Sequence, residues 1–351
     1  MINKEVYTKA YITEINKKYR ADPQIIERTV FAFGLLQALV KSGADFIFKG
    51  GTSLMLLLDK PLRLSTDIDI IVEPGYDISS YVEKAGKIYP FIRCEENVRR
   101  GFNDIVKRHF RFYYKSLIDE TKETPILLDV LFENNHYSSL IEKEIKTEFL
   151  ETSGSPVYIK LPSADSILGD KLTAFAPHTI GVKPMNRLDD GKIIDKRIET
   201  IKQFFDAASL YDAADNINET LETYKQTAAA ELKYRGLTFT YRDCLKDTFN
   251  AALSIMSRGK WHTEDYADYL AGIRGLGGYL IDIRFNAENA FKQASKVMYL
   301  TACMISETSP DTNIPEAKPF ADEYSFINYV RKLDRQSFNM AAKAIELMKN
   351  Q

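Results

Sequence analysis

Two aspartates separated by one residue, Asp67 and Asp69, are the side chains of this 351-residue chain whose type and spacing point most directly to chemistry. They stand in an apolar run that continues to Val72 and is typical of a β-strand. Because strand side chains alternate between faces, both carboxylates are predicted to point the same way. Adjacent carboxylates repel each other unless a cation lies between them, and Mg²⁺ takes oxygen ligands of this kind. The pair therefore predicts a metal site.

A glycine pair lies shortly before the aspartates, where a strand ends and a short helix is predicted to begin. Gly50 and Gly51 are followed by Thr52 and Ser53, which are predicted to cap the first turn of that helix. Backbone N–H groups at a helix start favour a phosphate. A phosphate cradle and a metal pair in one segment are the layout of a nucleotide site.

Three further polar residues are candidates for the same site. Arg63 and Ser65 precede the aspartates, and Ser65 either bonds a phosphate or caps the strand. Asp129 interrupts the apolar run 126–132, which is predicted to be a strand buried on both faces. A lone carboxylate there is costly to bury unless it is paired or metal-bound. It is either a hydrogen-bonded core carboxylate or a strand-edge residue or, in the interpretation we favour, a third metal ligand on a neighbouring strand.

The charge balance is near zero, with 47 Lys and Arg against 49 Asp and Glu. Binding of nucleic acid by bulk charge is therefore excluded, and any such contact needs a local patch. The range 99–115 offers one, because aromatic side chains interleave with basic ones; the basic residues are Arg99, Arg100, Lys107, Arg108, Arg111 and Lys115. This pattern is typical of a strand that stacks a base or holds RNA phosphates, and equally of a half-buried strand with a solvated basic face.

The remaining chemistry-bearing residues predict little. His109 and His136 have no partner at metal-ligand spacing and are expected to be structural. Three cysteines without paired spacing argue against a disulfide framework and a zinc cluster. No apolar run reaches the ~18 residues that a membrane span needs, and the N-terminus lacks a signal core, so a cytoplasmic protein is expected.

The elements that must position these side chains divide the chain in two. Residues 1–160 are predicted to be an α/β domain with N-terminal helices and a sheet of four or five strands, and residues 161–351 a helical domain. The predicted strands of the first part cover 45–49, 67–72, 107–115 and 126–132, and its later helices cover 52–58 and 79–89. The predicted helices of the second part cover 163–176, 191–210, 218–233, 241–257, 264–273, 287–305 and 324–349.

The motifs resemble those of a known family. Gly50 to Leu54 followed by Arg63 to Asp69 resembles the first motif of the AbiEii/AbiGii-type toxin nucleotidyltransferases, in the DNA polymerase β-like nucleotidyltransferase superfamily. Asp165 to Phe175 is similar to the family helix that bears a nucleotide-contacting lysine, here Lys171. Lys202 to Leu210 is similar to a third family region, although Ala207-Ala208-Ser209 replaces its usual second acidic position. The resemblance covers roughly residues 25 to 212.

The resemblance implies a fold and an activity. The fold is an α/β (α+β) nucleotidyltransferase head with a mixed sheet, followed by a mostly α-helical C-terminal half. The activity is Mg²⁺-dependent transfer of an NMP from an NTP to an RNA acceptor, with the tRNA 3′ end expected. The setting is a type IV toxin–antitoxin pair in abortive infection, a phage defence, with a cognate antitoxin encoded nearby.

The resemblance also implies residue roles. Asp67 and Asp69 bind both metal ions, and Asp129 completes the acceptor-side ion and helps to deprotonate the attacking hydroxyl. Gly50, Gly51, Thr52 and Ser53 hold the triphosphate, while Arg63 and Lys171 neutralise charge as pyrophosphate leaves.

Alternatives stay open for the residues of the second half. Lys171 is either a phosphate contact or a surface lysine in a salt bridge. Lys202 and Asp206, at i and i+4, either pair with each other or serve the nucleotide, with Asp206 orienting Lys171 or acting as a base.

Two other functions also remain open. One is kinase-like phosphoryl transfer to a protein serine, on the antitoxin or on Ser65 itself. The other is a catalytically decayed module that binds nucleotide or RNA and acts through its helical half.

Overall fold

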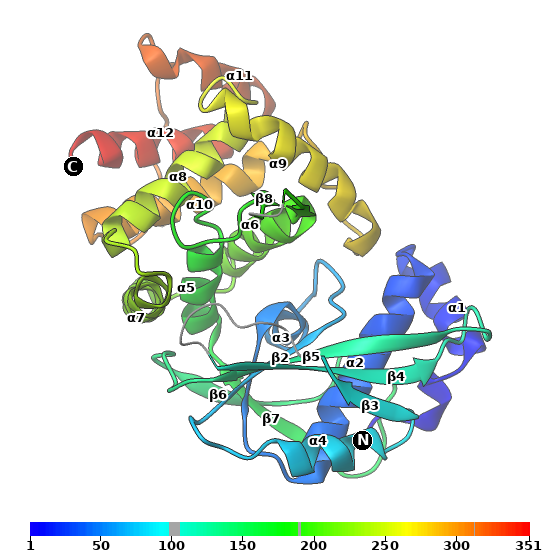
Figure 1. The fold of residues 1–351 in the computed structure, drawn as a ribbon. Coiled ribbons are helices and arrows are strands. Elements are labelled where there is room, and N and C mark those ends of the chain that lie inside the picture. Colours follow the sequence, from blue (N-terminus) through cyan, green and yellow to red (C-terminus); the bar gives the residue numbers. More distant parts are fainter. Residues whose placement is uncertain (98–105, 189–190, 312) are drawn as a thin grey trace. The chain divides into compact units, whose positions relative to one another are not determined.

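The computed structural model describes residues 1–97, 106–188, 191–311 and 313–351 (Figure 1). The chain forms two compact units. The first is Met1–Ser163 together with Gly278–Ile283, and the second is Ala164–Gly277 together with Arg284–Gln351. The chain therefore leaves the first unit, returns to it for a few residues, and leaves it again.

A five-stranded mixed sheet forms the centre of the first unit (Figure 1). Its order is β1-β2-β5-β4-β3, and β2 and β5 run parallel while the other neighbours are antiparallel. The strands are β1 (Ile47–Lys49), β2 (Ile68–Val72), β3 (Arg93–Glu96), β4 (Lys107–Lys115) and β5 (Glu123–Phe132). The four predicted strands are confirmed, and β3 is an edge strand that the sequence pattern did not predict.

One face of this sheet is buried, and the other is not. On β4, Phe110, Phe112 and Tyr114 are buried, whereas the residues between them are only partly covered. β5 alternates in the same way, so the prediction that it is buried on both faces is wrong. Asp129 lies on the less covered face with its side chain 45% exposed. We call this side of β2, β4 and β5, which carries Asp129, the open face.

Helices cover the buried face. Phe31 of α2 (Pro23–Ser42) stacks on Tyr114 with ring centroids 3.6 Å apart, and α4 (Ser79–Gly86) packs on α2 and β3. Asp22 caps α2 by accepting hydrogen bonds from the first-turn N–H groups, and Pro23 begins the helix. The other elements of this unit are η1 (Lys4–Val6), α1 (Lys9–Tyr19), α3 (Gly50–Leu57), β6 (Leu140–Glu144) and β7 (Tyr158–Pro162).

A segment from much later in the sequence completes the first unit. The backbone N–H of Leu64 donates to Tyr279 O at 2.7 Å, and Ile281 N donates to Leu62 O at 3.0 Å. Arg63 and Leu280 are thereby paired in an antiparallel bridge. We call residues 278–283 the return segment, because it braces the chain just before Asp67.

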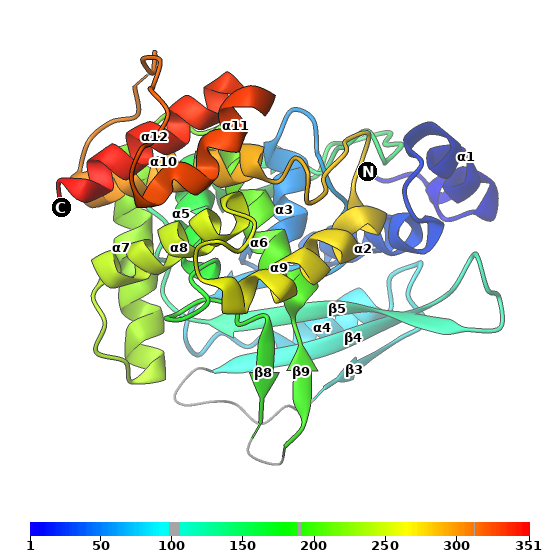
Figure 2. The same cartoon turned by 90° about the horizontal axis from the view of Figure 1, so that it is seen from above.

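The second unit is built from helices and one short strand pair. Its helices are α5 (Ala164–Ala174), α6 (Arg197–Tyr211), α7 (Ile217–Arg235), α8 (Tyr241–Met256), α9 (Thr263–Gly275), α10 (Phe291–Ser306), α11 (Asn328–Leu333) and α12 (Arg335–Lys349). Two 3₁₀ turns are η2 (Leu276–Tyr279), which leads into the return segment, and η3 (Glu323–Ile327). Figure 2 shows β8 (Met185–Arg187) beside β9 (Ile193–Asp195).

Two helix predictions for this unit are wrong in part. The helix expected over 191–210 begins only at Arg197, because β9 occupies residues before it. The helix expected over 324–349 is divided into η3, α11 and α12. The division falls at Asp334, whose extended backbone and side chain, which accepts from Ser337 N at 2.8 Å, make it the N-cap of α12.

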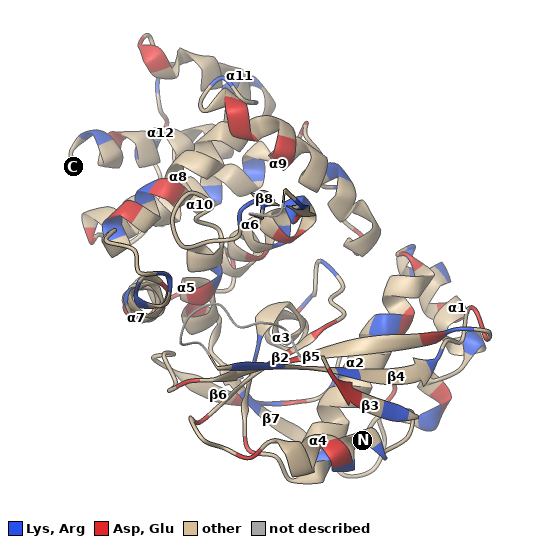
Figure 3. Cartoon of the chain, viewed as in Figure 1, with Lys and Arg blue, Asp and Glu red and all other residues tan. Residues whose placement is uncertain are grey.

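The distribution of charged residues agrees with the near-zero net charge of the chain. Figure 3 shows Lys and Arg interspersed with Asp and Glu in both units. Within the described ranges, no helix is both long enough and apolar enough to cross a bilayer.

Candidate active site

Three neighbouring strands bring two predicted carboxylates and a histidine into one row. The register of β2 against β5 pairs Asp69 with Asp129, and the register of β5 against β4 pairs Asp129 with His109. Residues opposite each other on paired strands point to the same side of the sheet. All three side chains therefore belong to the open face. The Nδ1 atom of His109 lies 2.6 Å from Asp129 Oδ1.

Gly50 begins α3 directly beside Asp69. Its φ of +79° lies in the left-handed region, and a Cβ atom there would stand 2.0 Å from Asp69 Oδ2. Glycine is therefore required at this position both by the backbone and by the approach of the carboxylate. The glycine turn and the aspartate strand thus lie side by side.

The predicted capping role of Thr52 and Ser53 is wrong. The N-cap position of α3 is Lys49, and the two hydroxyls donate hydrogen bonds to carbonyl groups instead. Thr52 Oγ1 donates to Asp67 O at 2.6 Å, and Ser53 Oγ donates to Gly50 O at 2.8 Å. A capping side chain must accept from an N–H group. Thr52 instead ties α3 to the residue that precedes β2.

Arg63 and Ser65 converge on the other glycine. A Cβ atom on Gly51 would lie 2.6 Å from Arg63 Nη2 and 2.9 Å from Ser65 Oγ. Arg63 is buried and donates from Nη1 to Leu64 O at 3.0 Å. The predicted nucleotide-binding residues of the first unit are thus gathered around the first turn of α3.

Asp67 is placed differently from the other two aspartates. Its Oδ1 atom lies 3.4 Å from Arg28 Nη2 of α2, and its side chain is 48% exposed. Among the residues that the structure describes, no three His, Cys, Asp or Glu side chains converge as a metal-binding group. The donors nevertheless suit Mg²⁺ chemically, and the strand register sets two carboxylates side by side. Arg28 is a partner that no sequence pattern indicated.

The predicted residues of the second unit form a buried ion pair. Lys171 Nζ of α5 lies 3.0 Å from Asp206 Oδ2 of α6, with side chains only 6% and 2% exposed. Lys171 also donates to Gln203 Oε1 at 3.1 Å. Lys171 is therefore not a surface lysine, although it does have an acidic partner, and that partner is Asp206. Lys202 lies one turn before Asp206 on α6, partly exposed.

Part of the predicted basic segment shares the open face. Arg111 and Tyr113 follow His109 at alternate positions of β4, and the guanidinium of Arg93 lies 3.5 Å from the centre of the Tyr113 ring. Arg108 belongs to the opposite side and makes two 2.8 Å hydrogen bonds to Glu96. Arg99, Arg100 and Phe102 lie outside the described residues.

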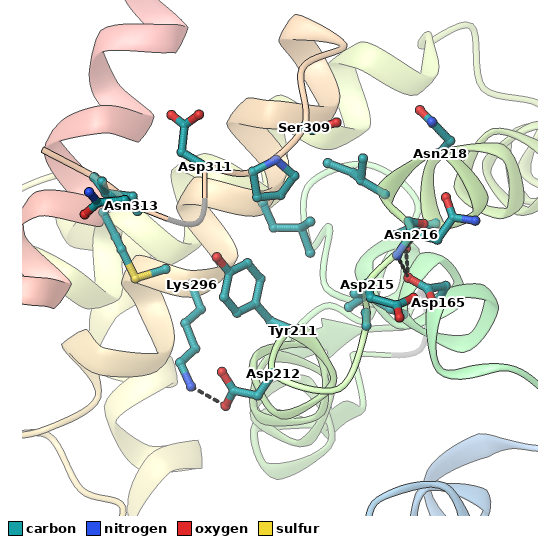
Figure 4. A pocket seen from close by; sticks show the side chains of 18 of the residues that line it. Asp165, Tyr211, Asp212, Asp215, Asn216, Asn218, Lys296, Ser309, Asp311 and Asn313 are labelled. Atoms are coloured by element: carbon teal, nitrogen blue, oxygen red, sulfur yellow. Dashed lines mark hydrogen bonds and ion pairs between the residues drawn. The ribbon is translucent and has the colours of Figure 1, made fainter.

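A separate cavity of about 870 Å³ lies within the second unit (Figure 4). It has an acidic lining that includes Asp165, Asp212, Asp215 and Asp311, and Lys296 pairs with Asp212 at 2.5 Å. Burial raises the pKa of the Asp165 carboxyl, which accepts from Asn216 N at 2.8 Å. The described residues that line this cavity include none of the predicted site residues.

Comparisons with known proteins give one family match and similarity to solved structures. A family model described as "Nucleotidyl transferase AbiEii toxin, Type IV TA system" matches residues 34–287, a range that includes both carboxylate strands and the return segment. A solved structure, an antigenic nucleotidyltransferase-like protein from Paracoccidioides brasiliensis, is 18% identical and covers 60% of this chain and 88% of that chain. Its TM-score of 0.37 is too low to support an argument about fold or function. No curated protein matches the sequence.

Proposed function

The chain belongs to the AbiEii family of nucleotidyl transferase toxins from type IV toxin–antitoxin systems, and from this premise we propose that it transfers an NMP from an NTP to a hydroxyl of RNA, with the tRNA 3′ end as acceptor. A toxin of this type has a cognate antitoxin. In the proposed reaction the hydroxyl oxygen attacks the α-phosphorus, the bond to the β-phosphate breaks, and pyrophosphate leaves. The observation that carries the proposal is the register pairing of Asp69 with Asp129 beside Gly50.

Asp67, Asp69 and Asp129 are the residues that we propose to hold Mg²⁺. The ion would offset the negative charge of the triphosphate, which the three carboxylates alone would repel. Asp67 would exchange its contact with Arg28 for the ion. Asp129, half exposed on the open face, would accept the proton of the attacking hydroxyl.

The chain's own groups would hold the phosphates. The first turn of α3, from Gly50 to Ser53, offers backbone N–H groups at a helix start. Arg63 is buried beside Gly51 and so supplies a positive charge at a fixed place. Contacts of Lys171, Lys202 and Asp206 with the nucleotide stay a prediction from the family resemblance.

The acceptor side of the proposal rests on β4. Arg111 and Tyr113 lie on the same face as Asp129, and Arg93 stacks on the tyrosine ring. A planar, partly exposed surface with positive charge suits an unpaired nucleotide, because its base can stack while its phosphate is neutralised. We therefore expect Arg111→Gln to raise the KM for RNA while leaving the KM for NTP unchanged. Arg108→Gln, on the opposite face of the same strand, is the matched control.

The decisive experiment incubates the purified protein with tRNA, Mg²⁺ and each α-³²P-labelled NTP in turn. Label on tRNA from one NTP is expected, and EDTA should abolish it. Asp69→Asn and Asp129→Asn should reduce the transfer by at least a hundredfold. Asp59→Asn, an exposed aspartate in the loop after α3, should not change it.

Other outcomes assign other functions. Label from γ-³²P-ATP on protein, with none from α-labelled NTP on RNA, would replace the proposal by phosphoryl transfer to a serine. Tight nucleotide binding without turnover under any divalent ion would indicate a decayed binding module. Near-normal transfer by Asp69→Asn would refute the carboxylate assignment.

A further inference from the structure

The hydrogen bond between His109 and Asp129 joins a covered imidazole to a half-exposed carboxylate. At 2.6 Å it is short, as in bonds between a nitrogen donor and a charged oxygen acceptor. The Asp129 side chain is 45% exposed and therefore has water available as an alternative partner. Burial alone does not demand this bond, because an exposed carboxylate can be satisfied by solvent. The bond satisfies the covered imidazole, whereas for the carboxylate it determines position rather than solvation.

His109 is the fixed member of the pair. Its side chain is only 16% exposed, and its strand lies inside the sheet, between β5 and β3. Its backbone carbonyl accepts from Asn97 N at 2.7 Å, which holds the residue from the side opposite Asp129. Asp129 has the greater freedom, because its side chain stands on the open face. The bond therefore restricts the carboxylate more than the imidazole.

The bond also determines which atoms remain for other partners. An ionised carboxylate can only accept, so Nδ1 of His109 carries the hydrogen and donates it to Oδ1. Since β5 lies between β4 and β2, Asp129 has His109 on one side and Asp69 on the other. The Oδ2 atom is left for chemistry next to Asp69. Hydrogen bonds of this kind to a ligating side chain commonly change metal affinity by about 10–100-fold.

We propose that His109 is a positioning residue that holds the Asp129 carboxylate beside Asp69, so that the two carboxylates meet a divalent cation and the acceptor hydroxyl as one preset pair. This inference rests on the proposed function of the same site. Without the imidazole, Asp129 would rotate among solvated conformers. Cation affinity and kcat would then fall, while the KM values for NTP and RNA would change little.

The test measures Mn²⁺ binding to the substrate-free protein by electron paramagnetic resonance, together with transfer kinetics. His109→Phe keeps a ring of similar size but removes the donor, and His109→Asn keeps an N–H donor close to the position of Nδ1. We expect His109→Phe to weaken Mn²⁺ binding by about tenfold and to lower kcat by about tenfold. His109→Asn should restore most of both. His136→Phe is the control histidine and should behave like the wild type.

The outcomes separate this inference from the proposed function. If Asp69→Asn and Asp129→Asn weaken Mn²⁺ binding but His109→Phe does not, the positioning role is wrong and the metal site stands. If neither aspartate variant affects Mn²⁺ binding, the metal site itself is wrong. Equal losses in His109→Phe and His109→Asn would reduce His109 to a structural role. Should His109→Phe fail to fold, His109→Leu replaces it under the same criteria.

Discussion

The surroundings of Gly50 leave no room for a side chain. The glycine has a left-handed backbone, and its missing Cβ leaves room for the Asp69 carboxylate. A side chain there would act twice, through backbone strain and through displacement of Asp69. The two effects are separable, because Gly75 has a similar φ of +83°, and a Cβ atom added to it would meet nothing within 4 Å.

Gly50→Ala should therefore abolish transfer, whereas Gly75→Ala should not. Gly75→Ala should lower the free energy of unfolding by about 1–2 kcal/mol, the cost of a left-handed conformation for alanine, and Gly50→Ala should lower it by at least as much. Urea unfolding and the tRNA labelling assay measure the two quantities on the same preparations. Normal transfer by Gly50→Ala would show that the position of Asp69 is not critical.

The buried ion pair of the second unit leads to a prediction about stability. Lys171→Met leaves Asp206 charged and enclosed, which should cost about 3–5 kcal/mol of unfolding free energy. The double variant Lys171→Met/Asp206→Leu should be more stable than Lys171→Met alone, because the enclosed carboxylate is removed as well. Removal of the exposed Lys87–Glu83 pair should leave unfolding unchanged. Additive losses in the double variant would contradict the pairing.

The contacts of the site that join residues far apart in the sequence could not be predicted from the sequence. Asp69 and Gly50 are close in sequence, and the strand around Asp69 follows from the local periodicity. The contact of His109 with Asp129 depends on the register of β4 against β5, and the bond of Lys171 to Asp206 depends on how α5 packs on α6. Register and packing are set by non-local interactions, which a single local pattern does not contain.

Helices and strands follow their local signals where those signals are strong. Asp22-Pro23 begins α2 and Thr240 begins α8 with a capping box, so these boundaries are readily predicted. The strands β8 and β9 have three residues each, too few for a periodic pattern. At Asp334 the apolar periodicity continues across the break between α11 and α12, so the pattern predicts one long helix where the structure has an N-cap.

Asp334→Ala should destabilise the protein by about 1 kcal/mol, because the cap of α12 is lost. Asp334→Asn should restore most of the stability, since asparagine caps as well as aspartate does. It also removes the charge that faces Lys292 at 3.7 Å, so it separates capping from ion pairing. Thermal unfolding monitored by circular dichroism measures both variants. Equal losses in the two would assign the effect to the charge.

At the scale of the whole molecule, the chain passes between the two units more than once. The first unit contains Met1–Ser163 and the return segment, so its core includes residues from both sides of α5 to α9. Ile281 of the return segment is fully buried in that core. A boundary drawn once along the sequence, as predicted near residue 160, does not separate the two units.

Ile281→Ala should therefore weaken the first unit, and Ile273→Ala, a buried isoleucine of α9, should weaken the second. Each truncation should cost about 2–5 kcal/mol through the cavity that it leaves. Hydrogen exchange followed by mass spectrometry should show faster exchange in β2 and β5 for Ile281→Ala, and in α6 and α9 for Ile273→Ala. The same exchange pattern in both variants would show that the units unfold together.

The return segment has a further consequence for the order of events on the ribosome. When Ser163 leaves the exit tunnel, the strands of the first unit have been made, but the partner of Leu62 and Leu64 has not. At about 5–20 residues per second, synthesis of Ala164–Gly277 delays that partner by on the order of ten seconds. During that time the nascent toxin would contain β2 and β5, but not yet the return segment that pairs with the chain beside Asp67.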